Sequence, residues 1–214
     1  MEATDTKNKI LNGASELFLR YGIRSISMDN IANHLGVSKK TIYQYFKDKD
    51  DMVISVTEAH VLKERAQMDE VVSQAKNAVE ELIELSGCLR ENFKDMNPLL
   101  LFDLQKYHHK AWEVWLAFKD HFIREQLART IGRGKEEGYF RLEVDAKIMA
   151  ILRLETIQFP FDPALFPKGA YSVLGLQMQI FDHFIYGLFT DKGRKLYEKY
   201  KKKFINKENT KIQL

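Results

Sequence analysis

The sequence predicts an all-α fold, and three observations indicate it. Apolar residues recur along most of the 214-residue chain at the three- and four-residue spacing of a helix face. Only four prolines and eleven glycines interrupt the chain, which favours long helices over a fold with many turns. No segment alternates strictly between apolar and polar residues, as a half-buried strand would. We therefore expect helices throughout.

The first part of the chain predicts four helices with clear end signals. Gly22 follows the first helix, and Ser27 is placed to cap the second, although Asn30 stands where a complete capping box would have glutamate. Gly36 ends the second helix, Ser38 caps the third and Asp48 the fourth. The expected ranges are residues 7–21, 28–35, 39–46 and 48 to at least 68.

The rest of the chain is also expected to be helical, and it divides from the first part inside the fourth helix. The expected helices span residues 75–94, 99–107, 110–137, 146–158, 170–189 and 192–204. Because the boundary near Asp51 falls within a helix, we expect two domains, 1–50 and 51–214, joined through a shared helix rather than a linker.

The composition excludes several classes of protein. No apolar run approaches the roughly 18 residues of a membrane-spanning helix, and residues 1–9 carry no signal-peptide core. Cys88 is the only cysteine, so we expect no intrachain disulfide and no cysteine-based zinc site. His109 and Glu113 have the i, i+4 spacing of a metal-binding pair, but no wider ligand set accompanies them. These features predict a cytoplasmic protein without membrane contact, metal or cofactor.

Charge is distributed unevenly along the chain. The net charge is +2 for residues 1–50, −6 for 51–191 and +7 for 192–214. A basic head and tail around an acidic middle suggest that any polyanion is bound at the ends. The tail lysines are equally explained as a solvated helix end.

Residues 26–46 have the pattern of a helix-turn-helix. Ala32 is small enough for two helices to cross closely, and Gly36 suits the positive φ of a tight turn. Val37 and Ile42 are expected to point into a three-helix core, as is Phe46. Hydrogen-bonding, cationic and aromatic residues are left to face outward on the third helix, which suits entry into a DNA major groove. Residues 36–49 carry a net charge of +3 for phosphate contacts.

This segment resembles the N-terminal domain of TetR-family regulators. The resemblance covers about residues 7–52 and rests on "LFLRYG", "ISMDNIANHLGVSKKTIYQYF" and Lys49. It implies that Ser38, Thr41, Tyr43, Tyr45 and Lys49 touch DNA, with Ser27 or Met28 near a phosphate. The full candidate set is Ser27, Met28, Ser38, Lys39, Lys40, Thr41, Tyr43, Gln44, Tyr45 and Lys49.

Two features leave alternatives open. Many members have a small residue at position 40, whereas Lys40 is long and charged, so it either contacts DNA or lies along the surface. Tyr43 and Tyr45 are expected to contact DNA, with a role as core aromatics as the alternative.

A late helix carries a candidate dimer seam. Its apolar residues recur at intervals of 3, 4, 3, 4 and 3, which is an a/d pattern: Tyr171, Leu174, Met178, Phe181, Ile185 and Leu188. The family resemblance implies that this helix and residues 146–158 form a four-helix dimer interface. An intramolecular core helix is the alternative.

Aromatic residues crowd residues 93–122 and suggest a cavity for a small hydrophobic or aromatic effector. The candidates are Phe93, Phe102, Tyr107, His108, Trp112, Trp115, Phe118 and Phe122, with Arg153 and Glu155 from a later helix. For any one of these aromatic residues, the alternative is that it packs in an ordinary helical core without contacting an effector. Arg153 and Glu155 either reach this cavity or pair across the dimer.

Taken with the resemblance, these features predict a DNA-binding transcriptional regulator. We expect a homodimeric repressor released from a palindromic double-stranded operator by an effector that shifts the fourth helix. The alternative is a DNA-binding regulator without a small-molecule effector, controlled by a protein partner. An enzyme is not expected, because no nucleophile or phosphate-cradling motif is recognisable.

Overall fold

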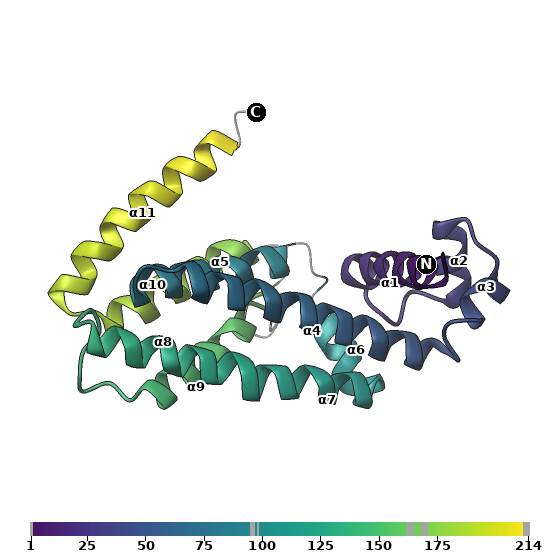
Figure 1. Cartoon of the computed structure of the whole chain (residues 1–214), viewed down its shortest axis with the longest axis horizontal. Helices are drawn as coiled ribbons and strands as arrows, with labels where there is room; N and C mark the ends of the chain where they lie inside the picture. The colour runs from purple at the N-terminus through teal and green to yellow at the C-terminus, as the bar shows by residue number, and fades with distance from the viewer. Residues whose placement is uncertain (1, 95–96, 98, 162–164, 168–170, 212–214) are drawn as a thin grey trace. The chain divides into compact units, whose positions relative to one another are not determined.

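The computed structural model confirms the all-α fold class. It describes residues 2–94, 97, 99–161, 165–167 and 171–211, and the side chains of residues 2–4, 89–94, 158, 161 and 202–211 are not described. Within these residues the chain forms helices and no named strand, with one isolated antiparallel bridge between Phe140 and Phe189. Two compact units account for the fold (Figure 1).

The first unit contains Met1–Ala66 and Glu91–Lys119. Its helices are α1 (Glu2–Tyr21), α2 (Met28–Leu35), α3 (Lys39–Tyr43), the first part of α4 (Lys49–Gln74), α6 (Leu99–Tyr107) and α7 (His109–Ala117). The expected functional domains, residues 1–50 and 51–214, remain a proposal. They differ from the compact units, because the first unit also includes α6 and α7.

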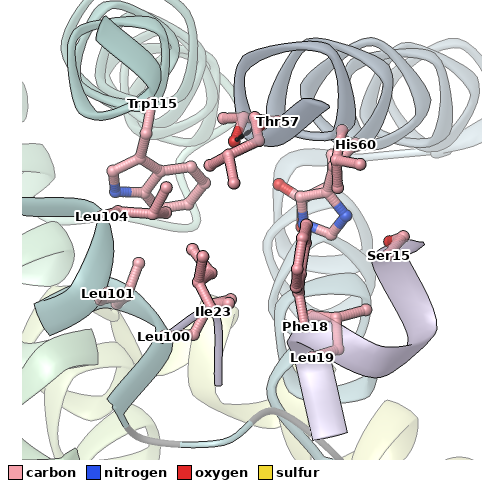
Figure 2. Close-up of a pocket in the computed structure, with 13 residues that line it drawn as sticks. Ser15, Phe18, Leu19, Ile23, Thr57, His60, Leu100, Leu101, Leu104 and Trp115 are labelled. Atoms are coloured by element: carbon pink, nitrogen blue, oxygen red, sulfur yellow. Dashed lines mark hydrogen bonds and ion pairs between the residues drawn. The ribbon is translucent and has the colours of Figure 1, made fainter. Parts of the chain in front are cut away.

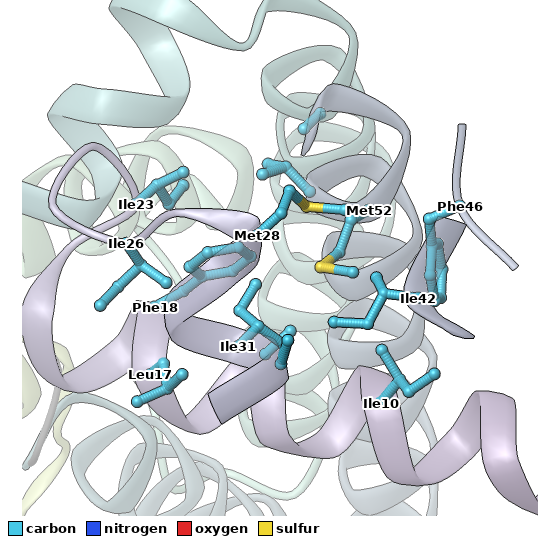
Figure 3. Packing of buried hydrophobic residues seen from close by; sticks show 14 of the residues in the cluster. Ile10, Leu17, Phe18, Ile23, Ile26, Met28, Ile31, Ile42, Phe46 and Met52 are labelled. Carbon is cyan, nitrogen blue, oxygen red and sulfur yellow. The ribbon is translucent and has the colours of Figure 1, made fainter. Parts of the chain in front are cut away.

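One hydrophobic core holds α1, α2, α3 and α4 together (Figure 3). Phe18 of α1, Ile31 of α2, Ile42 of α3 and Met52 of α4 are each at most 2% exposed. Burial of one such side chain stabilises a fold by about 1.5–3 kcal/mol. Phe46, at 1% exposed, also lies in this core, as expected. The short helix α3 is therefore held in place by its buried face and by its neighbours.

The turn between α2 and α3 follows the expected end signals, with one correction. Ser27 caps α2, because its side chain accepts a hydrogen bond from the Asn30 amide at 3.1 Å. The Asn30 side chain accepts one in return from the Ser27 backbone at 2.8 Å. The capping box is therefore complete, and the expectation from sequence that it is incomplete was wrong. The side-chain amide oxygen of Asn30 accepts the backbone N–H that a glutamate carboxylate accepts in the usual capping box. Gly36 ends α2 with φ +65°.

The second unit contains Gln67–Arg90 and Asp120–Leu214. Its helices are most of α5 (Ala78–Lys94), α8 (Arg124–Glu136), α9 (Ala146–Gln158), α10 (Val173–Leu188) and α11 (Asp191–Lys211). Helices α8 and α9 lie side by side, and α9 also contacts α10. An added Cβ at Gly134 would lie 2.1 Å from the Phe140 ring, so glycine lets this buried ring pack directly on α8.

A buried carboxylate ties α5 to α8 in this unit. Glu81 is 2% exposed and accepts hydrogen bonds from Gln126, Thr130 and Arg133 at 3.1, 2.5 and 2.8 Å. Arg133 also pairs with Glu137, whose second oxygen accepts the backbone N–H of Ala78 at 2.8 Å. A buried charge is tolerated when it is paired and hydrogen-bonded in this way.

Helix boundaries differ from the sequence prediction in several places, including the start of α5 at Ala78 and the end of α11 at Lys211. α1 begins at Glu2, earlier than expected. α3 ends at Tyr43 instead of residue 46. The expected helix 110–137 is interrupted by a π-helical segment, Phe118–Ile123. α10 begins at Val173 after Ser172, whose side chain caps it. The expected start at residue 170 lies outside the described residues.

Candidate nucleic-acid interface and effector site

Helix α3 presents a polar face that is fixed by local hydrogen bonds. The Ser38 side chain accepts the Thr41 amide at 3.0 Å, and the two hydroxyl oxygens lie 2.8 Å apart. Lys39 donates to the Asp29 carboxylate at 2.7 Å, which links α3 to α2 across the turn. This hydrogen bond also raises the pKa of Lys39 above its ordinary value. The N-terminus of α3 is thus both exposed and ordered.

The structure places most of the DNA-binding candidates on one exposed region. Tyr43 is 47% exposed, and the other exposed candidates are Ser27, Ser38, Lys39, Lys40 and Gln44. Thr41 and Tyr45 are half-buried, and Tyr45 packs against the core. Met28 is 6% exposed and lies inside the core, so only its backbone is available at the start of α2.

Lys49 is positioned differently from the other lysines. Its Nζ donates to the carbonyl oxygen of Ile23 at 2.7 Å. Burial lowers the pKa of Lys49, and the nearby carboxylates of Asp103 and Asp50 oppose that shift. A phosphate contact by Lys49 would therefore compete with a contact that joins the start of α4 to the loop after α1.

Helices α6 and α7 contact the helix-turn-helix domain through Asp103, which the sequence analysis did not single out, and through Tyr107 and His108, which it expected in an effector cavity. Asp103 is 5% exposed and accepts the backbone N–H of Arg24 at 2.9 Å. The Arg24 guanidinium lies over the Tyr107 ring, 5.3 Å from its centroid. His108 Nδ1 lies 2.7 Å from an Asp50 oxygen. The sequence feature that could have identified Asp103 as a buried contact is its position as the one acidic residue in the apolar run 99–104.

A cavity lies within the first unit, bounded by α1, α4, α6 and α7 (Figure 2). Its volume is about 60 Å³. The polar or ionisable residues of its lining are Ser15, Thr57, His60, Glu64 and Trp115. The others are apolar: Phe18, Leu19, Ile23, Val53, Val56, Leu100, Leu101 and Leu104.

Polar groups in the lining are largely buried. Thr57 is 8% exposed, and its hydroxyl donates to the Val53 carbonyl at 2.9 Å. Glu64 is 5% exposed and lies 3.1 Å from His60 Nε2. Trp115 is 9% exposed, and its Nε1 has no hydrogen-bond partner among the described residues.

Of the nine effector-site candidates whose side chains the structure describes, Trp115 alone lines this cavity. Phe102 and Tyr107 are exposed, and Trp112 packs against the helix-turn-helix core. His108 is engaged with Asp50, and Phe118 is buried beside Trp115. The second unit contains Phe122, Arg153 and Glu155; the Arg153 guanidinium lies over the Phe181 ring. Phe93 is among the residues whose side chains are not described.

The residues of the candidate dimer seam fall into two groups within the second unit. Phe181, Ile185 and Leu188 are at most 4% exposed in the single chain. Tyr171, Leu174 and Met178 are at least 41% exposed. Helix α9 adds further exposed apolar residues, Ile148, Ile151 and Leu152. The first part of the seam is thus uncovered in the protomer, and the last part belongs to its core.

Comparisons with known proteins agree with this architecture. Residues 10–56 match the family described as bacterial regulatory proteins, tetR family. An uncharacterised HTH-type transcriptional regulator of Bacillus subtilis, YvaF, is 25% identical over 78% of this chain and 87% of its own. A transcriptional regulator of Saccharomonospora viridis, solved in complex with choline, has a TM-score of 0.75 at 21% identity and covers 87% of this chain and 99% of its own. A TetR-family regulator of Agrobacterium tumefaciens has a TM-score of 0.72 at 19% identity, and the match covers 88% of this chain and 100% of that regulator.

The exposed polar α3, held across α2 by a capped turn, defines a helix-turn-helix DNA-binding protein. The family match covers this same segment. The match identifies residues 10–56 as a DNA-binding domain of the TetR family, and the chain is a DNA-binding transcriptional regulator. None of the described helices is both long and apolar enough to cross a membrane.

Proposed function

We propose that the chain represses transcription as a homodimer on a near-palindromic operator and is released by a small effector. The observation that carries the DNA-binding part is the ordered, exposed face of α3, which includes the cationic residues Lys39 and Lys40. A five-residue helix offers few base contacts, so two copies reading half-sites one helical turn apart would supply the specificity.

The uncovered apolar residues of α9 and α10 support dimerisation. Leu174 and Met178 on α10 are more than two-fifths exposed, as are Ile151 and Leu152 on α9. Exposed apolar residues that gather on two contacting helices mark a surface for a protein partner. In this proposal a second copy covers this face.

Release by an effector requires only that the effector bind the DNA-free form better. The Saccharomonospora viridis regulator holds choline, so a small ligand is compatible with this fold. Helix α4 begins six residues after α3 ends and contributes to both units, so it is one covalent connection through which a ligand would act on α3.

The test of DNA recognition begins with selection of bound sequences from a random DNA pool. The double variant Thr41→Ala/Tyr43→Ala should lose roughly 1–3 kcal/mol of preference for the selected site per base contact removed. Binding should fall steeply with salt concentration, because several lysines displace counterions. Electrophoretic mobility shifts over a salt series measure both effects.

Tyr21→Ala is the matched control for this test. Tyr21 and Tyr43 are both 47% exposed and both lie in the first unit, but Tyr21 ends α1. The control should keep the sequence preference of the wild type. Full preference in Thr41→Ala/Tyr43→Ala would remove α3 from the recognition surface.

A further inference from the structure

The cavity of the first unit shares its walls with the helix-turn-helix core. Phe18 and Ile23 line the cavity and are 2% and 1% exposed. Both also belong to the core that includes Ile31 of α2 and Ile42 of α3 (Figure 3). The wall opposite them includes Leu101 and Leu104 of α6 and Trp115 of α7 (Figure 2). A molecule in this cavity would therefore touch the DNA-binding domain directly.

We propose that this cavity is the effector site and that its ligand is a small, largely apolar molecule that carries no negative charge and has one hydrogen-bond acceptor. This inference rests on the proposed release by an effector and adds its site and its chemical class.

The lining does not suit an anion. Among the described residues it contains no lysine or arginine, and the one carboxylate, Glu64, is 5% exposed. His60 is the only described side chain of the lining that could carry a positive charge, and it already lies 3.1 Å from Glu64. Burial of a second carboxylate in these surroundings is costly because no cation would compensate it. Most of the lining is aliphatic, which favours an apolar body.

Trp115 supplies the reason for one acceptor. A buried indole N–H usually finds a hydrogen-bond partner. The Nε1 of Trp115 has no hydrogen-bond partner among the described residues, and Trp115 is only 9% exposed. A carbonyl or hydroxyl oxygen on the ligand would satisfy this donor.

The size of the cavity connects its occupation to DNA binding. Its volume of about 60 Å³ is far below the roughly 300–1,000 Å³ of common ligand pockets. Even a single six-membered ring therefore fits only if the walls separate. Because Phe18 and Ile23 form one wall, separation moves α1 and the core that positions α3. The ligand would thus favour a form with an altered recognition helix, and bound DNA would oppose the ligand equally.

The first experiment uses two probes with the same ring, cyclohexanone and cyclohexanecarboxylate. The full chain has two tryptophans, so its ¹⁵N–¹H spectrum has two indole signals, and Trp115→Phe assigns them. Cyclohexanone should shift the Trp115 signal saturably and the Trp112 signal less. The carboxylate should bind at least several-fold more weakly. Stronger binding of the carboxylate, or no shift with cyclohexanone, would overturn the proposed ligand class.

The second experiment fills the cavity. Val56→Phe from α4 and Leu100→Trp from α6 place larger side chains at its lining, whereas Leu62→Phe changes an α4 residue that is 66% exposed and does not line it. Cyclohexanone should weaken binding to the selected DNA by roughly 5- to 150-fold in the wild type and in Leu62→Phe. The filled variants should lose this response to cyclohexanone, which is compared with the affinity of each variant for DNA in the absence of cyclohexanone. Two filling variants from different helices guard against one that fails to fold, which thermal unfolding reveals.

The outcomes separate the two proposals. If the chain selects DNA but cyclohexanone neither binds nor affects DNA binding, the cavity assignment fails and the regulator proposal stands. If cyclohexanone still weakens DNA binding in both folded filling variants, the effector acts elsewhere. If no DNA sequence is selected, the proposed function itself fails.

Discussion

Gly36 shows how one residue supports the recognition helix. It ends α2 with φ +65°, and an added Cβ would meet nothing within 4 Å. Gly36→Ala should therefore lower the free energy of unfolding by about 1–2 kcal/mol, because alanine is strained in the left-handed backbone conformation. Urea unfolding followed by circular dichroism measures this loss.

Gly132→Ala is the matched control for Gly36→Ala. Gly132 lies inside α8 and also has nothing within 4 Å of an added Cβ, but its φ is not positive. Alanine there should be neutral or stabilise the protein by up to about 1 kcal/mol, because alanine favours a helix. Equal effects of the two substitutions would show that the conformation of Gly36 is not the cause.

At the scale of the element, α11 is held on α10 by tyrosines that donate to carboxylates. Tyr197 is 4% exposed and donates to Asp182 at 2.5 Å, and Tyr186 donates to Glu198. Lys201 pairs with the second oxygen of Asp182 at 2.5 Å. Burial and the hydrogen bond to Asp182 raise the pKa of Tyr197. The hydrogen bond to Glu198 is the main cause that raises the pKa of Tyr186, to about 12.

These contacts predict a loss of stability at alkaline pH. A raised pKa in the folded chain means that folding favours the neutral hydroxyl. The hydrogen bond of this hydroxyl therefore contributes fully to the free energy of unfolding below the ordinary tyrosine pKa of 10.0. For Tyr186 the contribution should disappear as the pH rises from about 10 to about 12. Tyr186→Phe should therefore show a shallower fall in the free energy of unfolding over this range, measured by urea unfolding at several pH values.

Tyr200→Phe, on α11, is the control for Tyr186→Phe on α10. The Tyr200 hydroxyl accepts a hydrogen bond from Asn77 at 2.9 Å and donates to no carboxylate among the described contacts. Its pH profile should run parallel to that of the wild type. A wild-type profile for Tyr186→Phe would indicate that the Glu198 contact does not stabilise α11.

At the scale of the whole molecule, the proposed dimer can be tested without disturbing the protomer. Leu174 is 41% exposed, so Leu174→Glu should fold normally but place an unpaired carboxylate in the proposed interface. Sedimentation velocity should show a dimer for the wild type and a monomer for this variant, with weakened operator binding. Phe181 is less suitable, because it is 4% exposed and glutamate there would disrupt the core of the protomer itself.

Leu62→Glu is the control for this substitution. Leu62 is 66% exposed on α4, outside the proposed dimer face, so its glutamate variant should remain dimeric. A Leu174→Glu variant that stays dimeric would remove the exposed end of the seam from the interface.

The sequence by itself determined the local features of this protein. Helix ends follow Ser27, Gly36 and Ser38 because caps act on backbone groups within a few residues. The core face of the helix-turn-helix follows helical spacing, so the buried positions of Ile42 and Phe46 were also predictable. The end of α3 was not, because the apolar periodicity continues to Phe46, three residues beyond the last residue of the helix, Tyr43.

Only the tertiary structure decided which distant residues meet. Asp103 accepts the amide of Arg24 79 positions away, and Lys49 donates to Ile23 rather than extending freely. The cavity combines Phe18, Thr57 and Trp115 from three helices, whereas the aromatic crowding of residues 93–122 brought only Trp115 to it. The a/d pattern of α10 likewise does not distinguish Leu174, which is exposed, from Ile185, which is buried. Periodicity specifies which face of a helix is apolar, and packing in three dimensions decides what covers that face.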